Sequence, residues 1–295
     1  MKRITSRGGS VVSRARVEEL RQLATTPAGL RPTPEPRWSH VPTSSLDADA
    51  PVFVLLHGLG LSHLSFSRLA RVLAQHGSVL APDLPGFGAA PGPRRRLDVD
   101  ELTEALLQRL DVVAPSAAGR APLVVLGHSL GAEIAVEVAR RRPHLVRALV
   151  LVGPVVDRIA ASAFGQGRRL LLDMAAEPPS TGAMVTRDYV RGGLFSFMAG
   201  VRSMLRYDTV GRLGDVTVPV LVLRGAHDPV APARWIAELA DVVADGTSAD
   251  VSSGVHNVVH SHPAEVARLV LTFLARHAPT ATSTEAQIEQ VPSGL

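Results

Sequence analysis

The chain has 295 residues, which is enough for one large α/β domain or two small ones. Its hydrophobic fraction of 46% can build a sizeable core, but no apolar stretch reaches the roughly 18 residues that a transmembrane helix needs. The absence of cysteine excludes disulfides, a thiolate nucleophile and a cysteine-bound zinc ion. We therefore expect a cytoplasmic protein without a membrane span.

The charge balance bears on nucleic acid as a partner. The formal net charge is +4, from 31 basic and 27 acidic residues, and aromatic residues make up 4% of the chain. Because acidic residues are interspersed among the basic ones and aromatic stacking platforms are scarce, the pattern does not favour a nucleic-acid-binding surface. We expect no nucleic-acid partner, and the composition leaves the oligomeric state open.

The first part of the chain changes character at about residue 50. Residues 1–50 are predicted to be an N-terminal extension, with a possible short helix and an edge strand from Arg37 to Thr43. Residues 52–56 form a continuous apolar run, which is typical of a parallel strand buried on both faces. A helix from Ser62 to about Gln75 and a short strand at 79–81 should follow.

The most informative stretch is the apolar run at 123–126, which leads into Gly127-His128-Ser129-Leu130-Gly131 and then into a strong helix former. A strand, a tight turn and a helix are the context in which Gly-x-Ser-x-Gly becomes a nucleophile elbow. Ser129 would lie at the apex of the turn. Gly127 and Gly131 would be glycines because a side chain there would collide with the neighbouring strand and helix.

The alternation of strands and helices continues at 148–152 and then fails from 155 to 212. That span is predicted to be helical but irregular, with a Pro178-Pro179 break and with glycines as hinges between short helices: Gly165, Gly167, Gly192 and Gly193. Alternation then resumes, with expected strands at 218–223 and about 250–253, helices at 232–240 and 263–277, and a flexible tail at 279–295.

A serine hydroxyl needs a base within hydrogen-bond reach and a third group that orients the base. Asp228 follows an apolar strand and His256 follows the last short strand, so both should lie at the same sheet edge as Ser129. Asp157 is a second candidate for the acid. His260 and His262 are second candidates for the base, and with His256 they could instead form a metal cluster, although we favour a single base without metal.

Together these motifs resemble the α/β-hydrolase superfamily over about residues 50–277. The resemblance rests on His57-Gly58-Leu59-Gly60, Asp83-Leu84-Pro85-Gly86-Phe87-Gly88, the Ser129 elbow, Gly225-x-x-Asp228, and His256 with Pro263 seven residues later. It implies an α/β fold with a mostly parallel, eight-stranded sheet flanked by helices. The core would comprise residues 51–154 and 213–278, and a helical cap at 155–212 would lie between strands six and seven.

The resemblance also implies the role of each site residue. Ser129 would be the nucleophile, His256 the base and Asp228 the group that orients it. The backbone N–H groups of Leu59 and Leu130 would form the oxyanion hole, which needs only backbone donors. We expect no cofactor and no metal ion.

The expected activity is that of a carboxylesterase- or lipase-like serine hydrolase acting on a small ester, thioester or lactone. Apolar residues of the span 155–212 suggest a pocket for an apolar acyl group, with Phe195, Phe197 and Met198 as candidate lining residues. The same triad could serve a C–C bond hydrolase or a peracid-forming enzyme. A third alternative is a protein that uses the fold to sense a ligand and recruit a partner.

Overall fold

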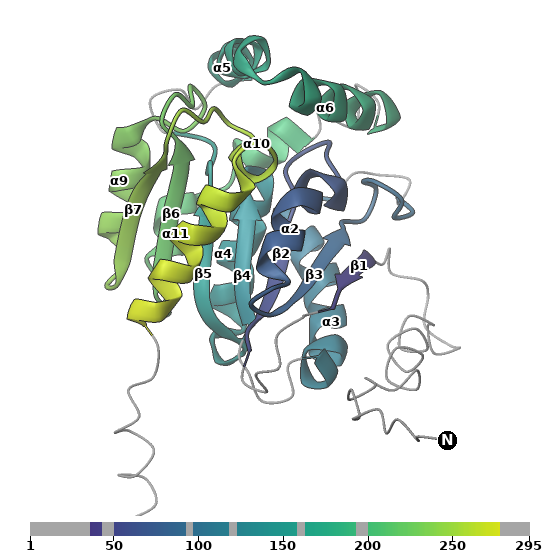
Figure 1. Ribbon diagram of the computed structural model, residues 1–295, viewed down its shortest axis with the longest axis vertical. Coiled ribbons are helices and arrows are strands. Elements are labelled where there is room, and N and C mark those ends of the chain that lie inside the picture. Colours follow the sequence, from purple (N-terminus) through teal and green to yellow (C-terminus); the bar gives the residue numbers. More distant parts are fainter. Residues whose placement is uncertain are drawn as a thin grey trace, which may run out of the picture.

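A seven-stranded sheet forms the centre of the computed structural model (Figure 1), which describes residues 36–42, 50–92, 97–117, 123–157, 163–192 and 200–277. Its strands are β1 (Arg37–Val41), β2 (Val52–Leu56), β3 (Ser78–Asp83), β4 (Leu123–His128), β5 (Val146–Val152), β6 (Val220–Gly225) and β7 (Gly246–Val251). They lie in the order β1-β3-β2-β4-β5-β6-β7. β1 is antiparallel to β3, and all other pairs are parallel.

The expectation of eight strands is wrong for the described residues. Before β2 the structure describes only residues 36–42 and 50–51, and this length provides a single strand, β1. The mostly parallel α/β sheet is confirmed. β7 begins at Gly246, earlier than expected, because its polar sequence lacks the apolar run by which the other strands were identified.

Helices cover both faces of the sheet, as a continuous apolar strand requires. Their bounds are α2 (Ser67–Leu73), α3 (Val99–Ala117), α4 (Leu130–Arg141), α8 (Thr209–Leu213), α9 (Ala233–Val242), α10 (Val258–Ser261) and α11 (Pro263–Arg276), with single 3-10 turns at His63–Phe66 and Pro143–Leu145. Figure 1 shows α2 and α11 together in front of the sheet, with α4 behind it.

Two hydrophobic clusters follow from the alternation of side chains along each strand. Phe53 and Leu55 of β2 pack in the cluster that contains α2 and α11. Val54 and Leu56 pack in the opposite cluster, which contains α3, α4 and α9. All five residues of β2 are buried, so this strand is fixed between two layers of helices.

The span 155–212, hereafter the helical insert, leaves the sheet after β5 and returns before β6. It contains α5 (Ala163–Ala176), α6 (Pro179–Gly192) and α8. Figure 1 shows α5 and α6 above the carboxyl ends of the strands. The Pro178-Pro179 break separates α5 from α6, as expected.

Gly165 and Gly167 both lie within the first turns of α5, which continues through them. The expectation that these two glycines are hinges between short helices is therefore wrong. A Cβ at Gly167 would meet no heavy atom within 4 Å, so packing does not require this glycine. Gly193 and the pocket candidates Phe195, Phe197 and Met198 lie outside the described residues, as do residues 1–35 and 278–295. No helix in the described part of the chain is long and apolar enough to span a membrane.

Candidate active site

Ser129 lies in a strained turn between β4 and α4. Its φ of 55° and ψ of −122° are values that non-glycine residues rarely adopt. A Cβ at Gly127 would overlap the backbone of Gly131, and a Cβ at Gly131 would overlap the backbone at Leu56. The two glycines therefore allow strand, turn and helix to approach closely enough to present Ser129 at the end of β4.

His256 and Asp228 form a direct pair, with 2.9 Å between Nδ1 and Oδ2. Both side chains are buried. The second carboxylate oxygen of Asp228 accepts hydrogen bonds from the backbone N–H groups of Val230 (2.7 Å) and Ala231 (3.1 Å), which fix its orientation. The imidazole N–H is thus directed at an anchored carboxylate, the arrangement that holds a histidine base in one tautomer.

The electrostatic surroundings favour the protonated form of His256. Burial lowers its pKa, but the charge and hydrogen bond of Asp228, together with the charges of Asp173 and Glu177, outweigh this effect and raise the pKa of His256 to about 9. A histidine in this position can hold a proton taken from a nucleophile until a leaving group receives it.

Ser129 and His256 line one cavity of about 230 Å³. Gly153, at the end of β5, allows the close approach of the pair beside it, because a Cβ there would lie 3.0 Å from His256 Nδ1 and 3.3 Å from Asp228 Oδ2. Its φ of 55° also favours glycine. The structure therefore brings Ser129, Asp228 and His256 to one edge of the sheet, where ligands bind in open α/β folds.

Leu59 and Leu130 border the same region from two directions. Leu130 is the first residue of α4, so its N–H has no acceptor within the helix. Leu59 follows β2, the strand next to β4, and lines the cavity. The two backbone N–H groups expected to form an oxyanion hole thus lie at the ends of neighbouring strands.

His57 and His128 have structural partners. His57 accepts a hydrogen bond at Nε2 from the Leu84 N–H (3.0 Å), so its Nδ1–H donates to the Gly58 carbonyl (2.9 Å). His128 Nε2 donates to the His256 carbonyl over 3.1 Å. Burial and the charge of His256 lower the pKa of His128 to about 3, so this ring is neutral. Its hydrogen bond supports the loop that carries His256.

The alternative candidates lie elsewhere. Asp157 is buried between Arg169 (2.9 Å) and Arg234, with both of which it forms ion pairs. His260 contacts Thr181 at 3.1 Å, and His262 contacts the Ser261 hydroxyl at 2.9 Å. Among the described residues no group of three His, Cys, Asp or Glu side chains could hold a metal ion, so the three histidines do not form a cluster there.

Two acidic residues at the end of α5 adjoin the site, and neither was predicted from the sequence: Asp173 in the last turn of the helix and Glu177 directly after it. Asp173 Oδ1 accepts a hydrogen bond from the backbone N–H of His256 (2.8 Å). Glu177 Oε1 accepts from the backbone and the side chain of Asn257, both at 2.8 Å. Burial raises the pKa of Asp173 to about 6 and also raises that of Glu177. The only sequence signal was their spacing of four residues, which puts them on one helix face.

Comparison with known proteins agrees with this geometry. The model of the alpha/beta hydrolase family matches residues 53–269. A pimeloyl-[acyl-carrier protein] methyl ester esterase from Aromatoleum aromaticum is 30% identical over 261 residues, which cover 75% of this chain and 96% of that protein. The magnesium-chelatase 30 kDa subunit of Rhodobacter capsulatus is 29% identical over 251 residues, covering 72% and 83%.

A thermophilic esterase from Thermogutta terrifontis has a similar fold, with a TM-score of 0.67 at 16% identity. The superposition covers 82% of this chain and 93% of that one. At 16% identity, this structural similarity shows the fold alone. The family model and the esterase relative indicate the same fold family. The protein is therefore a member of the alpha/beta hydrolase family and a hydrolase enzyme of that fold.

Proposed function

We propose that the protein is a serine hydrolase that cleaves a small ester, thioester or lactone through an acyl-enzyme on Ser129. The observation that carries this proposal is the anchored Asp228–His256 pair beside Ser129 on one cavity. The esterase from Aromatoleum aromaticum, which is similar over most of its length, supports the same class of reaction.

In the proposed mechanism, His256 removes the hydroxyl proton of Ser129 through Nε2 while its Nδ1–H donates to Asp228. The Ser129 oxygen attacks the carbonyl carbon, and the N–H groups of Leu59 and Leu130 stabilise the oxyanion. The tetrahedral intermediate expels the alcohol or thiol, which receives the proton from His256. Water, activated by the same histidine, then hydrolyses the acyl-enzyme and releases the acid.

The helical insert serves in this proposal as a cap over the active site. Side chains from α5, α6 and the helical turn at 200–204 line the cavity opposite Ser129, among them Leu170, Val185 and Met204. Their apolar character favours an acyl group with an apolar chain and keeps bulk water away from that chain. We also retain Phe195, Phe197 and Met198 as proposed acyl-group contacts.

The test is hydrolysis of activated esters and thioesters of increasing acyl length by the wild type and by Ser129→Ala. We expect loss of about 10⁴–10⁶ in kcat on removal of the nucleophile, with the fold retained by circular dichroism. Ser248→Ala, an exposed serine on β7, is the matched control and should keep full activity. Absence of turnover in the wild type on every substrate, with tight binding of an ester, would instead favour the ligand-sensing alternative.

A further inference from the structure

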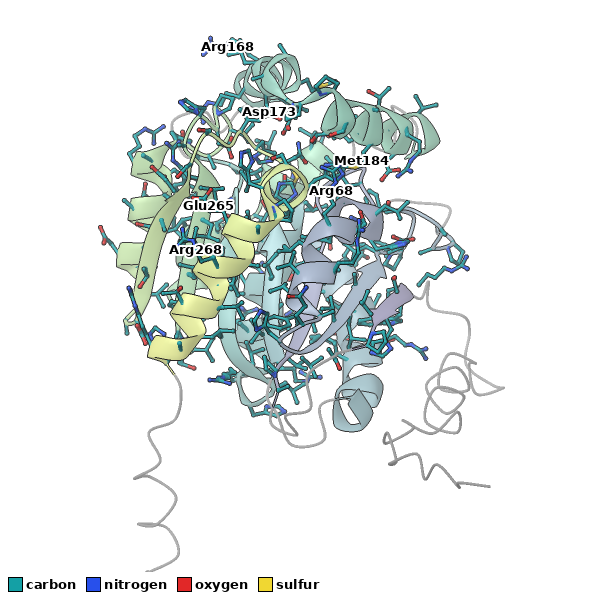
Figure 2. The ribbon with its side chains drawn as sticks, viewed as in Figure 1. Arg68, Arg168, Asp173, Met184, Glu265 and Arg268 are labelled. Atoms are coloured by element: carbon teal, nitrogen blue, oxygen red, sulfur yellow. The ribbon has the colours of Figure 1, made fainter. Side chains whose placement is uncertain are left out.

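The cavity at Ser129 contains two carboxylates that the proposed mechanism does not use. Asp173 lies on α5 and Glu177 is the first residue after that helix, one turn further on, with its N–H bonded to the Asp173 carbonyl (3.0 Å); both line the cavity. Figure 2 shows Asp173 on the side of α5 that faces the sheet, whereas Arg168 lies on the outer side. Asp173 is 1% exposed, so its carboxyl group is almost entirely withdrawn from bulk solvent.

Each of these carboxylates has only one oxygen in use. Asp173 Oδ1 and Glu177 Oε1 accept hydrogen bonds from the loop at His256 and Asn257. Asp173 Oδ2 and Glu177 Oε2 are buried and have no hydrogen-bond partner among the described residues. A buried, unpaired carboxylate oxygen costs free energy, so a ligand that brings a hydrogen-bond donor to this pair of oxygens would be favoured.

The charge of the cavity points to the nature of that donor. The described side chains that line it include these two carboxylates but no lysine or arginine. Arg169, one turn before Asp173 on α5, donates to Asp157 (2.9 Å) and to the Val230 carbonyl (3.4 Å). The protonated ring of His256 also lines the cavity, but its charge is paired with that of Asp228. Because Arg169 is paired as well, Asp173 and Glu177 leave negative charge in the cavity for a ligand to balance.

We propose that Asp173 and Glu177 form a subsite that binds a cationic, ammonium-type group of the substrate inside the cavity at Ser129. This inference rests on the proposed function, because it names the substrate class of that site. The cation would contact the two free oxygens, with the ring of Tyr189 also lining the cavity. An anionic substituent at the same position would be repelled by both carboxylates.

The experiment compares two aryl esters of equal shape at pH 8. The p-nitrophenyl ester of 4-(dimethylammonio)butanoate carries a cation with one N–H donor, and that of 5-methylhexanoate has a neutral isopropyl group in its place. We expect the wild type to favour the cationic ester in kcat/KM by about tenfold or more. The ratio should fall toward one in Asp173→Asn combined with Glu177→Gln.

These amide substitutions remove charge but keep a carbonyl oxygen that can accept from the loop at His256, so the site should stay assembled. Asp188→Asn is the matched control. Asp188 is a buried carboxylate of the same insert that accepts from the Ser62 hydroxyl (2.7 Å) and lies outside the cavity lining, so this variant should keep the wild-type ratio.

Binding provides a second measurement that does not depend on turnover. By calorimetry, n-butylammonium should bind the Ser129→Ala protein, and its affinity should fall about tenfold or more when Asp173→Asn is added. A wild type that hydrolyses the neutral ester at least as well as the cationic one would overturn the subsite. Equal slowing of both esters in the double variant would also overturn the subsite, because Asp173 and Glu177 would then only position the loop at His256 and Asn257.

The two proposals can fail separately. Loss of neutral-ester hydrolysis in Ser129→Ala supports the proposed function whatever the charge preference is. A charge preference in binding without turnover by Ser129 would retain the subsite and reject the serine mechanism.

Discussion

The sheet and the helical insert differ in how much of their packing against the rest of the molecule is polar. The sheet packs through apolar side chains, and every residue of β2, β4 and β6 is buried. The insert meets the active-site loops through buried polar pairs: Asp173 with the His256 N–H, Glu177 with Asn257, Thr181 with His260, and Asp188 with Ser62. The comparison teaches that the sheet fixes the reacting groups, while the insert surrounds the space beside them.

The outer surface of the insert also differs from the sheet, because it leaves large apolar side chains exposed. Among the described residues, the large hydrophobic side chains that are exposed all lie on α5 and α6: Leu172 (52%), Met174 (43%) and Val190 (78%). With less apolar burial than the sheet, the insert should open at a lower free energy than global unfolding. Substitutions of the reacting groups at the sheet edge should therefore abolish turnover. Substitutions in the insert should instead alter substrate selectivity, the pH dependence of kcat/KM or the free energy of unfolding.

After removal of the nucleophile itself, the largest effect is expected at the acid of the proposed triad. Asp228→Asn should lower kcat by about 10²–10⁴, because the imidazole of His256 loses the anchored acceptor at 2.9 Å that holds its tautomer. Circular dichroism should show an intact fold.

Asp157→Asn is the comparison, because Asp157 is equally buried but pairs with Arg169 and Arg234 rather than with His256. It should reduce stability more than turnover. If Asp157→Asn lost the activity and Asp228→Asn retained it, the acid would be misassigned.

The pH profile should report the carboxylates of the insert as well as Asp228. The base must be neutral to act, and the pKa of His256 is raised to about 9, so kcat/KM for a neutral ester should rise about tenfold per pH unit between pH 7 and 9. Replacing Asp173 and Glu177 by amides removes two charges that raise this pKa and should move the midpoint to lower pH. A wild-type midpoint near 6.5 would contradict the account.

An intermediate effect is expected at Val185 of α6, which is buried against Leu61 and lines the cavity. Val185→Ala should shift the preference among acyl lengths by up to about tenfold, since one or two methylenes in a pocket are worth roughly 1–3 kcal/mol. kcat/KM across the ester series measures it. Val190→Ala on the exposed face of the same helix should change nothing, and a common factor at all lengths for Val185→Ala would remove its role in specificity.

The smallest effect should come from one polar bond between the insert and the sheet. Ser62→Ala removes the donor to Asp188 (2.7 Å) and should lower the free energy of unfolding by about 1–3 kcal/mol in urea titrations. Ser180→Ala, at an exposed serine of α6, should leave it unchanged. If Ser62→Ala and Ser180→Ala had the same free energy of unfolding, the carboxylate of Asp188 would have sufficient hydrogen-bond donors without Ser62.

The sequence predicted best what is encoded locally. The apolar runs of β2 and β4 and the two glycines around Ser129 specify their structures within a few residues, so the elbow and the sheet edge followed directly. The order of Asp228 and His256 after later strands then predicted their meeting, because parallel strands end at one edge.

The features that were missed depend on contacts between distant segments. Asp173 and His256 are 83 residues apart, and nothing local to α5 indicates that Asp173 faces the loop that carries His256. Gly165 and Gly167 suggested hinges, but the helix continues through them, because tertiary context overrides a weak propensity of about 1 kcal/mol per glycine. The count of eight strands was inferred from resemblance alone, and the described chain before β2 has room for one.

The central claim is that Ser129 is the residue that becomes acylated. The most direct measurement is labelling with a fluorophosphonate probe followed by peptide mapping by mass spectrometry, in the wild type, Ser129→Ala and Ser248→Ala. We predict a single modified site at Ser129 in the wild type and in Ser248→Ala, with no label in Ser129→Ala. Label on another residue, or continued ester hydrolysis by an unlabelled Ser129→Ala protein, would contradict the account.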